Sequence, residues 1–150
     1  MTIPITSTKI LYEQDYCKWI QTTIEKLKIR QIEGIDWANL IEELTAMGRS
    51  EKKALLSNLR ILLMHLLKWK YQPSKRTNSW DFTIAEHRNR LEDDFKTSPS
   101  LKPYFLESLD ECYEKAIKLA AKETGLSLDT FPVTCPFTSE QILNSDYLPE

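Results

Sequence analysis

One segment of the chain, residues 65–90, concentrates the residue types that could contact an anionic ligand. It carries six lysine or arginine side chains against two acids, and four aromatic side chains are interleaved with the cations. Cations neutralise phosphates and aromatic rings stack on bases, so this composition is typical of a surface that binds nucleic acid or another polyanion. The candidate anion-binding side chains are Lys68, Lys70, Lys75, Arg76 and Arg88.

The same segment also has a purely structural interpretation. Trp69 and Trp80 could pack in the corner between two helices while the cations face water, because aromatic side chains in helical bundles most often belong to the hydrophobic core. Residues 126–150 carry four acids and no lysine or arginine, so this stretch could also lie over the basic segment and cancel its charge.

A second group of polar side chains follows one side of the helix predicted near residues 50–71, at spacings of three and four residues. Two glutamates end the preceding predicted helix and would meet this stripe if the two helices fold back antiparallel. A histidine facing a glutamate could be an acid–base pair or half of a metal site, and a buried structural ion pair is the alternative. The candidate polar site comprises Glu42, Glu43, His65, Lys68, Gln72 and Arg76.

The spacing of the histidines argues against a metal or cofactor site. His65 and His87 are the only two, and the chain has no Glu-x-x-His or His-x-x-x-His motif of the kind that di-iron and zinc sites use. We therefore expect no metal, no cofactor and no catalytic residue. One enzymatic alternative comes from Arg60 and His65, whose spacing resembles the motif of the HEPN ribonucleases, although one continuous helix would separate them by about 140°.

The composition predicts an all-α protein. The chain has 150 residues, 41% hydrophobic and 28% charged, with a net charge of −2 and only three glycines. This length indicates a single domain, and the scarcity of glycine disfavours turn-rich β folds and phosphate-binding loops. Three cysteines that cannot all pair, no secretory signal and no apolar run of membrane-spanning length predict a cytoplasmic protein without membrane contact.

The hydrophobic pattern divides the single helical domain into three parts: a loose N-terminal arm (residues 1–10), a bundle of four to five helices (11–125) and a wrapped acidic C-terminal arm (126–150). In the bundle we expect helices near residues 11–32, 36–48, 50–71, 80–96 and 100–124, the second and third being either separate or one rod bent at Gly48. The wide leucine stripe of the third helix predicts that Leu59, Leu63 and Leu66 are buried. Thr138 and Gln141 have capping-box spacing for one short helix in the arm.

Several longer motifs make the chain resemble a known family. They are YEQDYCKW near the start, DWANLIEELTAMGRSEKK, HLLKWKYQPSKRTNSWDFTI, the SPSLK break, AAKETGL and the closing FPVTCPFTSEQILNSDYLP. With these motifs the chain resembles a family of domains of unknown function that is abundant in cyanobacteria, number 29 in its series, from about Tyr12 to the C-terminus. The resemblance implies a small all-α domain without an established activity and assigns no site residue.

Three functional hypotheses follow from the sequence. The first is a cytoplasmic interaction module that binds a macromolecule, nucleic acid or an acidic protein, through its basic and aromatic segment at residues 65–90. The second is a metal-independent HEPN-like ribonuclease. The third is a structural homo-oligomeric unit, which a large self-complementary apolar patch would favour.

Overall fold

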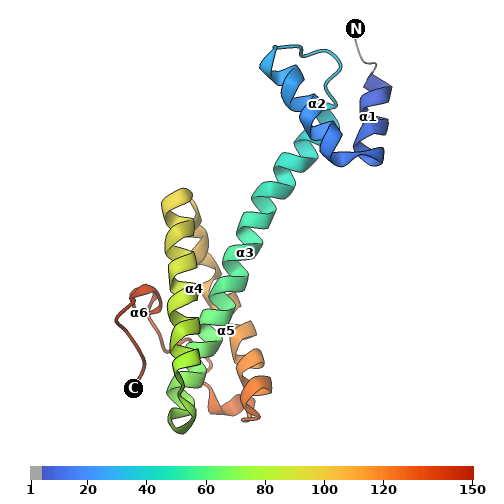
Figure 1. Ribbon diagram of the computed structural model, residues 1–150. Coiled ribbons are helices and arrows are strands. Elements are labelled where there is room, and N and C mark those ends of the chain that lie inside the picture. The colour runs from blue at the N-terminus through green and yellow to red at the C-terminus, as the bar shows by residue number, and fades with distance from the viewer. Residues whose placement is uncertain (1–4) are drawn as a thin grey trace. The chain divides into compact units, whose positions relative to one another are not determined.

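The computed structural model describes residues 5–150 and confirms an all-α fold. Within that range the chain forms six α-helices and two short 3₁₀ helices, with no strand (Figure 1). The α-helices are α1 (Ile5–Gln14), α2 (Tyr16–Lys28), α3 (Trp37–Tyr71), α4 (Asn78–Thr97), α5 (Leu101–Thr124) and α6 (Ser139–Leu143). The 3₁₀ helices are η1 (Pro73–Lys75) and η2 (Leu128–Thr130).

The chain divides into two compact units, an N-terminal unit of residues 1–50 and a C-terminal unit of residues 51–150. The long helix α3 belongs to both, with residues 37–50 in the first unit and residues 51–71 in the second. The single domain expected from the chain's length stays a prediction.

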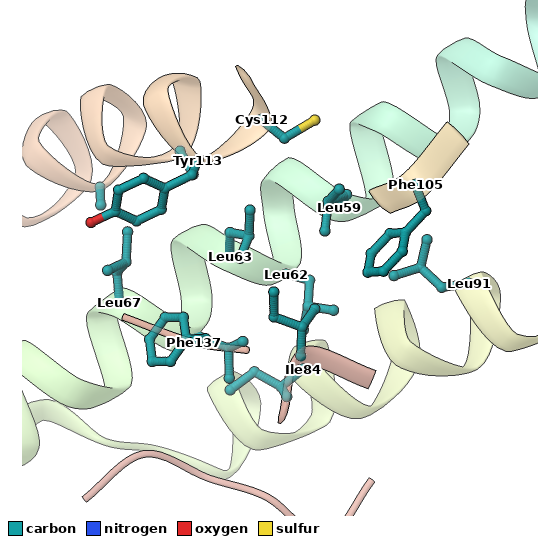
Figure 2. Packing of buried hydrophobic residues seen from close by; sticks show 14 of the residues in the cluster. Leu59, Leu62, Leu63, Leu67, Ile84, Leu91, Phe105, Cys112, Tyr113 and Phe137 are labelled. Atoms are coloured by element: carbon teal, nitrogen blue, oxygen red, sulfur yellow. The ribbon is translucent and has the colours of Figure 1, made fainter. Parts of the chain in front are cut away.

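The C-terminal unit is built around the leucine stripe of α3. Leu59, Leu63 and Leu66 have no exposed surface, as the periodicity predicted. Residues from α4 and α5 pack against this stripe, among them Ile84 and Phe105 (Figure 2). Since helix α3 contributes six of the buried leucines, it is the central element of this unit.

The C-terminal arm packs onto the same core. Phe131, Phe137 and Ile142 are each at most 5% exposed and belong to the same hydrophobic cluster. The capping box predicted for the arm is present: the Thr138 hydroxyl accepts from the Gln141 N–H at 3.1 Å, and the Gln141 side chain accepts from the Thr138 N–H at 3.0 Å. The arm is therefore a folded part of the C-terminal unit.

Three predicted boundaries differ from the structure. Residues 5–10 of the expected loose arm lie in helix α1, while residues 1–4 are outside the described part of the chain. The helix expected over residues 11–32 is interrupted at Asp15, whose side chain caps α2 by accepting from the Lys18 N–H at 3.0 Å. The two helices expected over residues 36–71 are one, because α3 continues through Gly48.

The N-terminal unit has a small core. Among its described residues, the only buried large hydrophobic side chains are Trp19 and Ile35, whereas the cluster of the C-terminal unit contains seventeen buried residues. The apolar side chains that the helical pattern placed toward a core are largely exposed here, including Leu44 at 58% and Met47 at 63%. A unit of about 50 residues that buries so little apolar surface gains little stability of its own.

None of the helices in residues 5–150 combines the length and the apolarity that crossing a membrane requires.

Candidate functional site

Arg88, one of the five candidate anion-binding side chains, is used inside the protein. It is 4% exposed, and its guanidinium donates to two backbone carbonyls of the C-terminal arm, those of Ile142 at 2.8 Å and Gln141 at 3.1 Å. A guanidinium that already satisfies two buried carbonyls is not available to an external phosphate. The arm thus reaches the basic segment, which the sequence left open, and it contacts Arg88 through neutral carbonyls rather than through its acids.

Arg76 plays a similar internal part. Its Nε donates to the Trp69 carbonyl at 2.8 Å, and its Nη2 donates to the Pro149 carbonyl at 3.3 Å. Its guanidinium carbon also lies 5.1 Å from the centre of the Trp69 ring, which is within cation–π range. Arg76 therefore ties the last residues of the arm to the end of α3.

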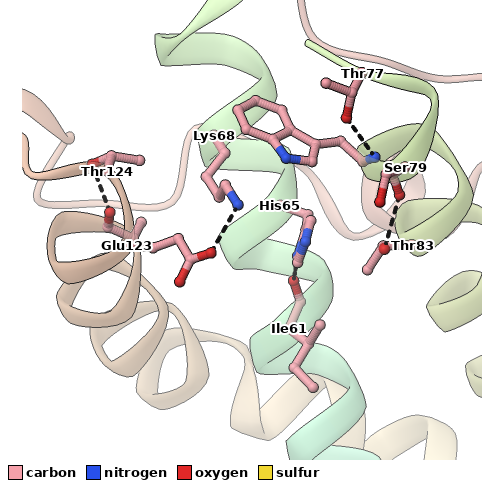
Figure 3. A network of polar contacts seen from close by, with 10 residues as sticks. Ile61, His65, Lys68, Thr77, Ser79, Thr83, Glu123 and Thr124 are labelled. Carbon is pink, nitrogen blue, oxygen red and sulfur yellow. Dashed lines mark hydrogen bonds and ion pairs between the residues drawn. The ribbon is translucent and has the colours of Figure 1, made fainter. Parts of the chain in front are cut away.

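Lys68 has an acidic partner, but a different one from the pair that the sequence suggested. Its ammonium lies 3.3 Å from the carboxylate of Glu123 on α5 (Figure 3). It also lies 4.4 Å from the centre of the Trp80 ring. The ammonium group is almost wholly enclosed, with 6% of the side chain exposed. Three of the five candidate cations are thus bonded inside the protein. Among the described residues, the other two, Lys70 and Lys75, make no side-chain hydrogen bond or ion pair.

The polar stripe on α3 is a set of separate structural contacts. His65 Nδ1 lies 3.0 Å from the Ile61 carbonyl, and Asn58 Oδ1 lies 3.1 Å from His87 Nδ1. Burial lowers the pKa of both histidines, which keeps the rings neutral near pH 7. The side chain of Gln72 is half-buried, and its backbone N–H continues α3 by donating to the Lys68 carbonyl at 2.9 Å.

The glutamate pair belongs to the N-terminal unit. Glu43 accepts hydrogen bonds from the phenol groups of Tyr12 and Tyr16, each at 2.5 Å, while Glu42 is exposed. The corner that would have turned these carboxylates toward His65 is not formed, because α3 is continuous. The expected contact between the glutamates and His65, Lys68 or Arg76 is therefore wrong.

The contact between Tyr12 and Glu43 gives a testable pH dependence. The hydrogen bond to the Glu43 carboxylate, followed by desolvation, raises the pKa of Tyr12 to about 12. A raised folded-state pKa means that the contact stabilises the fold below the ordinary phenol value of 10.0, and that this stabilisation is lost as the pH rises toward 12. Replacing Glu43 with glutamine should move the Tyr12 titration back toward 10.

The measurement is the ultraviolet absorbance of tyrosinate during a pH titration, taken as the difference between each protein and the same protein carrying Tyr12→Phe. Glu42→Gln is the matched control, because Glu42 contributes only the last and smallest of the charge effects on Tyr12. Equal midpoints in Glu43→Gln and the parent protein would show that the hydrogen bond does not hold the proton on Tyr12.

One hollow in the N-terminal unit is largely apolar. A cavity of about 280 Å³ is lined from α2 by Trp19, Ile24 and Leu27 and from α3 by Leu44 and Met47. Apart from Trp19, these side chains are 41–63% exposed. Exposed apolar side chains that gather around one groove are typical of surfaces that contact another protein, a membrane or a ligand.

The charge around this groove is low. Its only ionisable acid is Glu43, whose carboxylate is already bonded by two phenols, and these bonds lower the pKa of Glu43. The indole N–H of Trp19 is buried beneath the groove without a hydrogen-bond acceptor among the described residues. The groove therefore offers an apolar contact surface whose described residues carry no unpaired charge for a charged partner to neutralise.

The sequence does contain a signal for this surface, but helical periodicity alone does not tell whether the apolar face is buried or exposed. The apolar positions of residues 11–47 repeat at helical spacing, which we interpreted as a face packed in the bundle. The structure exposes that face in the N-terminal unit. Glu123, the partner of Lys68, was missed for another reason, since no local pattern joins two residues 55 positions apart.

Among the described residues, no group of three or more histidine, cysteine, aspartate or glutamate side chains is placed to hold a metal ion. The sequence model of the family described as domain of unknown function DUF29 matches residues 11–148. No curated protein and no solved structure matches the chain.

Proposed function

The chain belongs to the family of domains of unknown function DUF29, and this membership assigns it no activity. From the geometry we propose that the protein is an interaction module that self-associates through its N-terminal unit. The observation that carries this proposal is the exposed apolar groove between α2 and α3. The occupant of the groove is the same face of a second copy of the chain.

Self-complementarity supports a second copy as the occupant. In a twofold-symmetric dimer one patch must supply both the hollow and the side chains that fill it. This face has both, because the groove is flanked by projecting apolar side chains, with Leu44 58% and Ile41 61% exposed. Since Glu43 is the single charged side chain among the described residues that line the groove, the face also meets its own copy with little like-charge repulsion.

The small core of the N-terminal unit supports the same conclusion. Two buried large hydrophobic side chains give this unit little stabilisation, so its helices gain from further apolar contact. A dimer supplies that contact by covering the side chains that the isolated unit leaves in water. The oligomer hypothesis raised by the sequence is thus better supported than polyanion binding through residues 65–90, where three of the five candidate cations are bonded internally. It is also better supported than the ribonuclease hypothesis, which rests on the spacing of Arg60 and His65 alone.

The test is the molar mass in solution, measured by light scattering or sedimentation over a range of protein concentrations. The parent protein should reach twice the monomer mass, and Leu44→Glu should remain a monomer because it places a charge at the centre of the apolar contact. Phe82→Glu is the matched control, since Phe82 is 70% exposed on α4 outside this face, and it should dimerise like the parent protein.

Circular dichroism should show the same helix content in both variants. A parent protein that is monomeric at every concentration would overturn the proposal, and so would a Leu44→Glu variant that dimerises as well as the Phe82→Glu control.

A further inference from the structure

A second cavity, in the C-terminal unit, differs from the apolar groove in both composition and charge. It has a volume of about 400 Å³ and lies between α3 and α5. Helix α3 contributes Lys53, Ser57 and Arg60, which are spaced by four and three residues and so share one face of the helix. Helix α5 contributes Glu111 and Lys115 from the facing side.

The charges around this cavity do not cancel. Lys115 pairs with Glu111 at 3.4 Å, and both side chains are more than half exposed, so this ion pair is weak. Among the described residues, Lys53 and Arg60 have no ion-pair partner. Three cations against one acid leave the cavity with a net charge of +2.

The remaining wall of the cavity is neutral and partly apolar. It is formed by Leu56 and by the buried side chain of Cys112, whose Sγ faces the Leu56 carbonyl at 4.0 Å. Burial raises the pKa of the Cys112 thiol, although the charge of Arg60 acts against this shift. The thiol is therefore uncharged near pH 7 and does not repel an anion.

We infer that this cavity binds a small organic phosphate, with Arg60, Lys53 and Lys115 around the phosphate and Leu56 and Cys112 against the organic group. A guanidinium can hold two phosphate oxygens at once, and the two ammonium groups add point charges that tolerate several orientations. The Ser57 hydroxyl supplies a neutral donor at the same rim. This site shares no residue with the surface proposed for the dimer, because its residues belong to the C-terminal unit.

A small ligand fits the site better than a nucleic acid does. The volume is that of a small-molecule pocket, and an apolar wall beside a cationic rim suits a compact molecule with one charged end. A nucleic-acid surface needs cations spread over several phosphate spacings, and the basic segment at residues 65–90 uses three of its five candidate cations internally.

The experiment is a calorimetric titration of the full chain with phenyl phosphate at low ionic strength. The parent protein should bind one equivalent saturably, and Arg60→Gln should lower the affinity at least about tenfold, the loss expected when a charge-assisted contact is removed. Lys53→Gln, at an exposed position, is a second variant that should also weaken binding. Lys118→Gln is the matched control, because Lys118 is an exposed lysine of α5 outside the cavity.

Two results would overturn the inference. One is binding that does not saturate or that is equally strong in Arg60→Gln and Lys118→Gln, which would mean that phenyl phosphate is attracted only by general surface charge. The other is a parent protein that does not bind phenyl phosphate, which would mean that the cavity holds no such ligand.

Discussion

Replacing Leu63 with alanine should lower the free energy of unfolding of the protein by about 2–5 kcal/mol. Leu63 has no exposed surface and lies in the cluster where α3 meets the helices and the arm of the C-terminal unit. Its truncation removes apolar contacts and leaves a cavity that the surrounding helices can only partly fill. Leu59 and Leu66, which are equally buried, should respond in the same way.

The measurement is denaturant-induced unfolding followed by circular dichroism. Leu106→Ala on α5 is the control, because Leu106 is 49% exposed and its truncation should cost less than about 1 kcal/mol. Losses below roughly 1 kcal/mol at all three buried positions would show that α3 is not the centre of the unit.

Replacing Arg88 with methionine should lower the free energy of unfolding by about 3 kcal/mol and release the C-terminal arm. Methionine keeps most of the apolar stem but removes the two donors that satisfy the carbonyls of Gln141 and Ile142. Hydrogen bonds from a charged group contribute about 1.5–3 kcal/mol each, and an unpaired buried carbonyl adds a further cost. The expected loss of stability is therefore as large as the loss expected when a core leucine is truncated to alanine.

The chain offers a close control for this substitution. Arg90 lies two residues further along α4, is 54% exposed and pairs only with Glu86 within one turn of the helix. Arg90→Met should therefore change stability by less than about 0.5 kcal/mol. Limited proteolysis provides the second measurement. Cleavage within residues 138–150 should be faster in Arg88→Met than in the parent protein, and unchanged in Arg90→Met. Equal protection of the arm in both variants would refute its anchoring by Arg88.

The sequence determined those features that depend on neighbouring residues. The leucines of residues 55–66 recur at helical spacing, and a stripe this wide has to face a core, so burial of Leu59, Leu63 and Leu66 could be predicted. The capping box of Thr138 and Gln141 likewise needs only four consecutive residues. Gly125 stands in the left-handed conformation, φ 73°, just after α5, as a glycine that ends a helix does.

The candidate sites depended on contacts between distant residues, which no local pattern contains. A cation-rich segment predicts a charged surface only if its side chains remain in water, and Arg88 instead donates to carbonyls 53 and 54 residues away. Glu43 and Lys68 found partners in Tyr12 and Glu123 for the same reason. The sequence linked Arg60 with His65 only through their spacing. In the structure Arg60 lines a cavity together with residues of α5.

The sequence by itself thus determined the helices and the central leucine stripe, because both follow from periodicity within a single segment. Only the tertiary structure decided which charges are used inside the protein and which apolar face is left uncovered. Amphipathic helical spacing shows that a face is apolar, but the identity of what covers that face depends on the packing of other elements. On α2 and the first part of α3 the face stays exposed, and for this reason the surface proposed for self-association could be located only in the folded chain.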